Sequence, residues 1–293
     1  MRRVIALIVL LAAGPAMSAP NPEQGYLAAR DHAVAALKKM SGKKQDAEDT
    51  RLRAGLQKQL QALINPPPLD GFPGPATISP ETLLADDIGF DSLDGLTFRT
   101  KDDTGSVLVT TDGLLRSWLQ AHKNFWKDEP NPPTEPEAAF RSEVFYTQAA
   151  SPDAAVSIYA SLPIRKPDGA TGAVAFLVQE SQDIATEPPE QMAVVAAKGG
   201  TIFIAIVKTD VKPAPIDACT AVWKDFEAKS QAALKKYDDS GLKDQKSFDE
   251  STKLEGQGEA AFHKCWSEKA PGNPAFGALT KQAQGLVDLF TSR

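Results

Sequence analysis

The chain has 293 residues and a mass of 31.4 kDa, and 42% of its residues are hydrophobic, 24% charged and 7% aromatic. That composition is typical of a globular protein and excludes a collagen-like, an intrinsically disordered or a largely membrane-embedded chain. The 38 acidic residues outnumber the 32 Lys and Arg, and the resulting net charge of −6 and pI near 5.2 argue against binding to the phosphate backbone of nucleic acids.

The first residues have the three-part pattern of a secretory signal peptide. Arg2 and Arg3 precede an apolar run at residues 4–13, and small residues follow up to Ala19. A helix needs roughly twenty apolar residues to cross a bilayer, and this run is much shorter, so no permanent membrane anchor is predicted. We expect cleavage after Ser18 and a periplasmic or secreted location.

Proline-rich stretches at residues 65–75, 128–136 and 212–215 interrupt the rest of the chain. Proline lacks an amide donor and disfavours helix in the residue before it, so each stretch ends regular structure. The predicted organisation is a signal peptide at 1–18, an N-terminal helical segment at 19–68, an α+β sheet domain at 76–212 and a C-terminal helical segment at 213–293.

Two amphipathic helices are predicted in the N-terminal segment, at residues 26–40 and 49–64, because apolar residues recur there every three or four positions. Residues 41–44 join them. The lysine pairs at 38–39 and 43–44, like the pair at 235–236, have acidic neighbours and are interpreted as solvated helix surface.

In the sheet domain, turn-forming residues between two β-prone runs at 96–100 and 106–110 predict a hairpin. Thr111 and Asp112 can then cap a helix. That helix carries an apolar stripe that we interpret as core, made of Leu114, Leu115, Trp118, Leu119 and His122.

The strongest strand signals lie between residues 140 and 212. The predicted strands are residues 142–148, 155–162, 172–179, 191–197 and 201–209. Gly199 and Gly200 suit a tight hairpin between the last two. Short connections imply an antiparallel meander. Residues 201–207 are apolar on both faces, which indicates a central strand covered on both sides.

Three helices are predicted in the C-terminal segment, at residues 217–237, 248–266 and 276–290. Cys219 and Cys265 are the only cysteines, and in an oxidising compartment such a pair is typical of a structural disulfide. The bond would tie the start of the first helix to the end of the second, as in an antiparallel helical hairpin. The predicted fold class is therefore α+β, with a central, mostly antiparallel β-meander covered by N-terminal helices and a disulfide-linked C-terminal helical hairpin.

Residues 84–94, which contain Asp91-Ser92-Leu93 shortly after Gly89, resemble the prosthetic-group attachment site of acyl carrier proteins. The resemblance implies that Ser92 would carry phosphopantetheine. It covers about eleven residues of the chain. In that family a helix begins at the serine, whereas here Gly95 and the polar residues at 99–105 would end a helix after little more than a turn. We therefore interpret the string as a capped turn that leads into the strand at Leu96.

Other catalytic or metal-binding patterns are incomplete. Residues 90–93 are also similar to the Gly-Asp-Ser-Leu of a hydrolase family, but that family's downstream Asp-x-x-His is missing. The three histidines have no metal-ligand spacing, the acidic cluster lacks the order of a calcium loop, and the tryptophans are interpreted as core. These residues are His32, His122 and His263; Asp86, Asp87, Asp91 and Asp94; and Trp118, Trp126, Trp223 and Trp266.

The sequence thus predicts no catalytic, cofactor-binding or metal-ligating residue. We expect an exported, non-catalytic binding or protein-interaction protein, whose partner is a protein or a small apolar ligand. The alternative is an envelope hydrolase whose two catalytic carboxylates are brought together only by folding, because such a pair leaves no sequence motif. Two close carboxylates in a cleft would favour the alternative.

Overall fold

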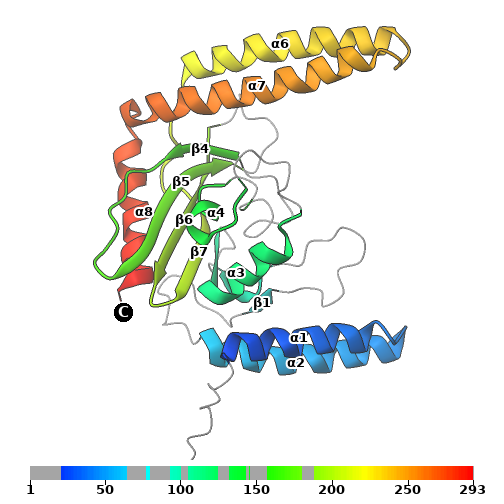
Figure 1. The fold of residues 1–293 in the computed structure, drawn as a ribbon. Coiled ribbons are helices and arrows are strands. Elements are labelled where there is room, and N and C mark those ends of the chain that lie inside the picture. Colours follow the sequence, from blue (N-terminus) through cyan, green and yellow to red (C-terminus); the bar gives the residue numbers. More distant parts are fainter. Residues whose placement is uncertain are drawn as a thin grey trace, which may run out of the picture.

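A computed structural model of the chain describes residues 21–64, 77–79, 93–99, 105–124, 132–142, 145, 157–179 and 188–292. A central antiparallel sheet carries helices on both faces, and two pairs of antiparallel helices lie at its opposite edges (Figure 1). The α+β fold class and the disulfide-linked C-terminal helical hairpin are confirmed. The predicted signal peptide and Ser92 lie outside the described residues.

Seven strands form the sheet in the order β1-β2-β3-β7-β6-β5-β4, and every neighbouring pair is antiparallel. Strands β4 to β7 correspond to four of the five strands of the predicted meander, and β3 pairs with β7 to attach the predicted β2–β3 hairpin. The strands are β1 (Thr77–Ser79), β2 (Gly95–Arg99), β3 (Gly105–Thr111), β4 (Ser157–Ser161), β5 (Ala170–Gln179), β6 (Gln191–Lys198) and β7 (Thr201–Lys208).

The helices follow the predicted periodicity, although several of their boundaries differ from the predicted ones. The helix predicted at 49–64 begins earlier, and the helix predicted at 248–266 runs through Gly256 and Gly258 without interruption. The helices are α1 (Pro22–Leu37), α2 (Lys43–Ile64), α3 (Asp112–Ala121), α4 (Pro136–Ala139), α6 (Asp217–Asp239), α7 (Gln245–Lys269), the short 3-10 turn η2 (Ala270–Gly272) and α8 (Phe276–Thr291).

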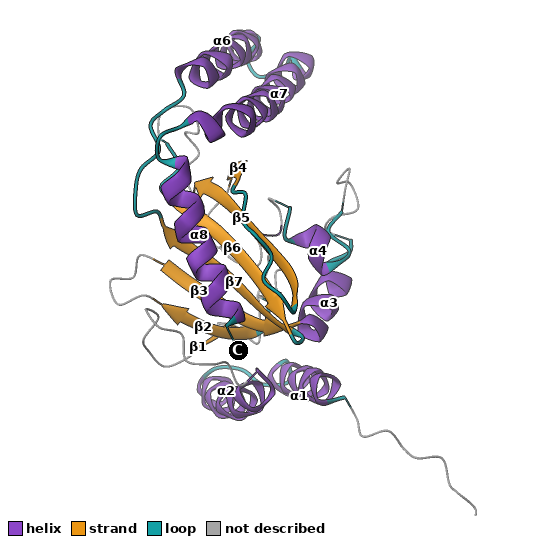
Figure 2. Cartoon of the chain, turned by 90° about the vertical axis from the view of Figure 1, so that its left-hand side faces the viewer, coloured by secondary structure: helices purple, strands orange, loops and turns teal. Residues whose placement is uncertain are grey.

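The sheet is buried on both faces, with α8 on one and α3 and α4 on the other (Figure 2). Along β7, alternate side chains enter the two apolar clusters, as the two-sided apolar run predicted. Phe203 stacks on Phe290 of α8 with ring centroids 5.1 Å apart, while Ile204 belongs to the cluster under α3. The predicted stripe of α3 is buried, with Leu115, Trp118 and Leu119 in that second cluster and Leu114 in the first. The Thr111 hydroxyl accepts a hydrogen bond from the Leu114 amide at 3.2 Å.

One predicted strand is wrong where the structure describes it. Within residues 142–148, Ser142 lies outside any strand and Phe145 is in a helical turn. The Phe145 ring is fully buried and makes edge contacts with the rings of Trp118 and Phe140, at 6.2 and 5.9 Å between centroids. Packing under α3 and α4 therefore overrides the local β-propensity.

Among the helices that the structure describes, none combines the length and the apolar character needed to cross a bilayer.

Candidate functional site

Two antiparallel helical hairpins stand out from the sheet and are the candidate interaction elements. The α6–α7 hairpin lies at the β4 edge and the α1–α2 hairpin near the opposite edge, and both point to the same side of the molecule (Figure 1). After a 90° turn about the vertical axis, the two hairpins are seen nearly end-on (Figure 2). At 1.5 Å per residue, α6 is about 35 Å long and α1 about 24 Å, so each hairpin holds its tip well away from the core.

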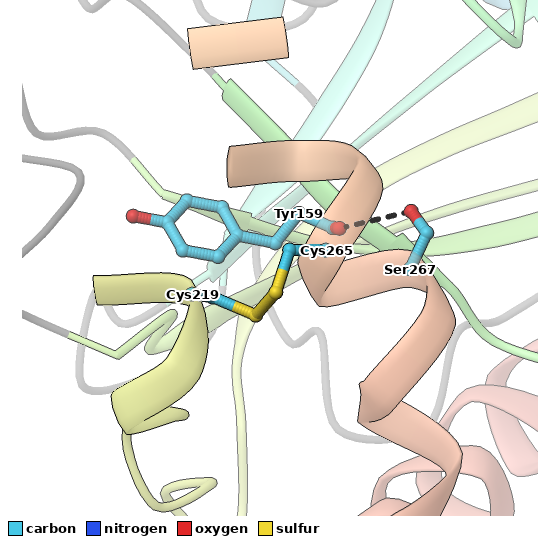
Figure 3. Close-up of a disulfide and its surroundings, with 4 residues drawn as sticks. All are labelled: Tyr159, Cys219, Cys265 and Ser267. Carbon is cyan, nitrogen blue, oxygen red and sulfur yellow. Dashed lines mark hydrogen bonds between the residues drawn. A yellow bond between two sulfur atoms is a disulfide. The ribbon is translucent and has the colours of Figure 1, made fainter. Parts of the chain in front are cut away.

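The base of the α6–α7 hairpin is fixed to the sheet. The predicted Cys219–Cys265 disulfide is confirmed, with Cα atoms 5.5 Å apart (Figure 3). Beside it, the fully buried ring of Tyr159 on β4 makes edge contacts with Phe262 and Trp266 of α7, both at 5.4 Å between centroids. The Ser267 hydroxyl donates to the Tyr159 carbonyl at 3.3 Å. These contacts hold α7 against β4, and α6 lies on the outer side of α7.

Small and polar residues line the α6–α7 interface away from its base. The Ser230 hydroxyl lies 2.8 Å from that of Ser251 and donates to the Glu255 carboxylate at 2.9 Å. Gly258 faces α6 so closely that a Cβ at this position would lie 2.6 Å from the Cβ of Phe226. Helices α6 and α7 therefore pack closely against each other along this part of the hairpin.

We expect alanine substitutions at the two glycines of α7 to have opposite effects. Gly258→Ala forces α6 and α7 apart and should lower the free energy of unfolding by about 1–3 kcal/mol. Gly256→Ala meets nothing within 4 Å and should raise it by about 0.5–1 kcal/mol, because alanine is the better helix former. Chemical denaturation of both variants tests the close packing, and equal effects at the two positions would refute it.

The distal tip of this hairpin, residues 237–248, is an ordered turn. Gly241 has a φ of +69° and donates to the Asp238 carbonyl, and the Leu242 amide donates to the Tyr237 carbonyl. This pair of bonds is the Schellman pattern that ends many helices. Asp244 then caps α7 by accepting from the Ser247 amide and hydroxyl, and these bonds lower the pKa of the Asp244 carboxyl.

Two large apolar side chains are exposed on this ordered tip. Leu242 is 62% exposed and Phe248 is 42% exposed, with the Phe248 ring 5.2 Å from that of Tyr237. Leu242 also has a φ of +64°, a left-handed conformation that disfavours non-glycine residues. A Schellman turn commonly has an apolar residue at this position, packed back on its helix. Here the leucine side chain faces water instead, so neither burial nor backbone conformation explains why a leucine occupies position 242.

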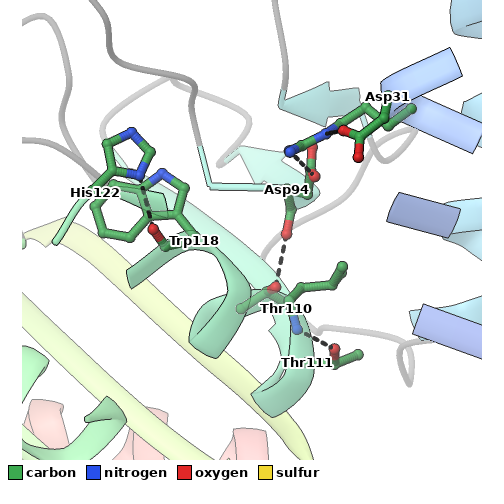
Figure 4. Close-up of polar contacts among 8 residues, drawn as sticks. Asp31, Asp94, Thr110, Thr111, Trp118 and His122 are labelled. Carbon is green, nitrogen blue, oxygen red and sulfur yellow. Dashed lines mark hydrogen bonds and ion pairs between the residues drawn. The ribbon is translucent and has the colours of Figure 1, made fainter. Parts of the chain in front are cut away.

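A buried ion pair holds the middle of α1 in the α1–α2 hairpin to the sheet. Arg30 Nη1 of α1 lies 2.7 Å from Asp94 Oδ2, just before β2, and the Asp94 carboxylate is 3% exposed (Figure 4). The Asp94 carbonyl accepts from the Thr110 hydroxyl at 2.7 Å. Burial, and then the negative charge of Asp94, raise the pKa of the Tyr26 hydroxyl well above its ordinary value. Asp94, the last residue of the carrier-like string, thus anchors a helix to the sheet.

The remaining residues considered from the sequence are dispersed. His122 is buried in the core, with Nδ1 2.8 Å from the Trp118 carbonyl. His32 is exposed on α1, and His263 lies beside the Tyr159 ring on α7. Among the described residues, no three His, Cys, Asp or Glu side chains are grouped to hold a metal ion. Trp118 and Trp266 are buried and Trp223 is half-buried, whereas Asp86, Asp87, Asp91 and Trp126 lie outside the described residues.

Sequence reasoning located both hairpins but did not single out their tips. The sequence did contain a signal for one tip: Leu242 is an apolar residue in a polar turn, and Phe248 follows at the start of the next helix.

Comparison of the chain with models of protein families, with curated proteins and with solved structures found no match. A function for this chain therefore has to rest on its own residues.

Proposed function

We propose that the protein is an exported, non-catalytic interaction protein that binds a partner protein through the tip of the α6–α7 hairpin. The N-terminal signal-peptide pattern supports export, and a disulfide is compatible with an oxidising compartment. The proposal rests chiefly on one observation, the exposure of Leu242 on a rigid tip held far from the core.

The tip has the properties of a small protein-binding surface. Aromatic and apolar side chains are the usual anchors of such surfaces, and a rigid turn loses little conformational entropy on binding. Its charges nearly balance, since residues 237–248 contain two lysines and three aspartates. Lys235 is paired with Asp239 at 2.7 Å, which raises the pKa of that lysine. Leu242 and Phe248 would therefore dominate recognition.

The carboxylate-pair hydrolase remains a hypothesis that no observation favours. The carboxyl groups of Glu48, Glu190 and Asp244 have a pKa shifted from the ordinary value. Hydrogen bonds to Arg51, Lys212 and Ser247 lower all three. A lowered pKa keeps the carboxylate ionised, whereas a general acid needs a raised one.

The substitution Leu242→Asn should abolish binding of the partner without lowering the stability of the fold. Asparagine tolerates the left-handed conformation better than leucine, so the free energy of unfolding should stay the same or rise by up to about 1 kcal/mol. The measurement is the native mass, compared with the denatured mass, of the chain isolated from its own host. We expect the wild-type chain to carry an excess of one partner's mass and the variant to lose it.

Val211→Asn is the matched control, because Val211 is 37% exposed but lies in the loop after β7. This variant should keep the bound partner. The proposal fails if the wild-type native and denatured masses agree, or if both variants lose the partner equally.

A further inference from the structure

The tip of the α1–α2 hairpin, residues 38–44, carries a dense positive charge on an acidic protein. It contains four lysines, Lys38, Lys39, Lys43 and Lys44, and all four are exposed. Met40, between the two pairs, is one of the few large hydrophobic side chains of the described chain that are exposed, at 41%. The loop therefore combines flexible cationic side chains with one apolar side chain at the end of a projecting element.

The neighbouring carboxylates do not neutralise these lysines. In α2, Arg51 binds Glu48, with Nε donating to Oε2 at 2.8 Å, and Arg53 binds Asp49. The hydrogen bond from Arg51 lowers the pKa of Glu48. Asp46 is the only acidic residue within positions 38–47. In the described part of the chain, no ion pair joins any of the four lysines to a carboxylate.

This charge distribution distinguishes the two tips. The α6–α7 tip balances its lysines with aspartates and exposes Leu242 and Phe248, while the α1–α2 tip is basic. Both tips point to the same side of the molecule (Figure 1). A broad surface on that side can therefore meet both hairpins at once.

We infer that the α1–α2 tip binds the surface of an anionic phospholipid membrane. All four basic residues of the tip are lysines. Arginine suits bidentate recognition of one phosphate or carboxylate, whereas the compact charge and flexible stem of lysine suit attraction to a charged plane. Lysine clusters attract anionic lipid headgroups, and one apolar side chain can enter the interface between headgroups and acyl chains.

The length of the hairpin makes this contact possible for a chain with a net charge of −6. Repulsion between the acidic body and an anionic membrane is screened beyond about 10 Å at moderate salt. From Arg30, which is anchored to Asp94, helix α1 runs about 12 Å further to Lys38. The lysines can therefore approach the headgroups while the anchored part of the body stays about one screening length away. The same placement brings the α6–α7 tip to a partner at the membrane surface.

The test is flotation of the purified chain with vesicles of mixed phosphatidylglycerol and phosphatidylcholine, and with vesicles of phosphatidylcholine alone. We expect binding to the anionic vesicles that weakens as salt is added, and little binding to the neutral ones. Each lysine near an anionic surface contributes about a fivefold factor in affinity, so Lys43→Gln with Lys44→Gln should weaken binding about 25-fold.

The matched control removes the same charge elsewhere, with Lys58→Gln on α2 and Lys264→Gln on α7, both exposed. It should change the affinity less than twofold. If the chain binds neutral vesicles as well as anionic ones, apolar residues cause the attachment. If the control variant binds anionic vesicles as weakly as the Lys43→Gln, Lys44→Gln variant, the net charge of the chain causes it. Either result overturns the inference. So does absence of vesicle binding, or a clear preference for nucleic acid or an acidic protein. The assay contains no host protein, so its outcome is independent of the partner proposed for the α6–α7 tip.

Discussion

Replacing both Cys219 and Cys265 with alanine is expected to lower the free energy of unfolding by about 3–4 kcal/mol. The disulfide closes a loop with a sequence separation of 46 residues. Without it, the unfolded chain gains conformational freedom that the folded hairpin does not share. For a chain of this size, we expect the melting temperature to fall by roughly 6–16 °C. The measurement is thermal unfolding followed by circular dichroism.

A reducing agent supplies the control for this prediction. It should destabilise the wild-type chain by the same amount and leave the double alanine variant unchanged, because the described chain has no other cysteine. A wild-type chain that is equally stable with and without reductant would contradict the stabilising role of the bond.

Arg30→Met is expected to cost about 3 kcal/mol, because it leaves the Asp94 carboxylate buried without its cation. Asp94→Asn should cost less, about 1–2 kcal/mol, since Arg30 is 22% exposed and can turn toward water. Urea unfolding of both variants measures the two losses.

Arg51→Met provides the comparison for a surface pair, since Arg51 is 68% exposed in its pair with Glu48. We expect no measurable change in stability from this variant, because exposed ion pairs are screened by water and salt. If Arg30→Met were equally harmless, the pair of Arg30 with Asp94 would not be what fixes the α1–α2 hairpin to the sheet.

Local patterns predicted most of the fold, because most of its elements carry their own signal. The two-sided apolar run of β7 indicated a strand covered on both faces, and the two cysteines indicated the hairpin that they join. The two elements that the sequence did not predict correctly have physical causes. Strand β1 has only three residues and is defined by pairing with β2, and Phe145 is placed by aromatic packing rather than by strand pairing.

The candidate surfaces were harder to predict. The pairing of Arg30 with Asp94 spans 64 positions and follows no local spacing, so only the fold reveals it. Small residues within the two helices, such as Ser230 of α6 and Gly258 of α7, did indicate that α6 and α7 pack tightly on each other. That packing leaves the tip free of the core, which the periodicity of the separate helices could not indicate.

Site-specific photo-crosslinking in the living host tests the interaction role most directly. A photoreactive residue is placed at position 242 on the α6–α7 tip or, as a control, at position 221, which is exposed near the base of α6. The proposed function predicts one discrete adduct in the envelope fraction from position 242 and none from position 221. Absence of an adduct from the tip, or adducts of equal yield from both positions, would contradict it.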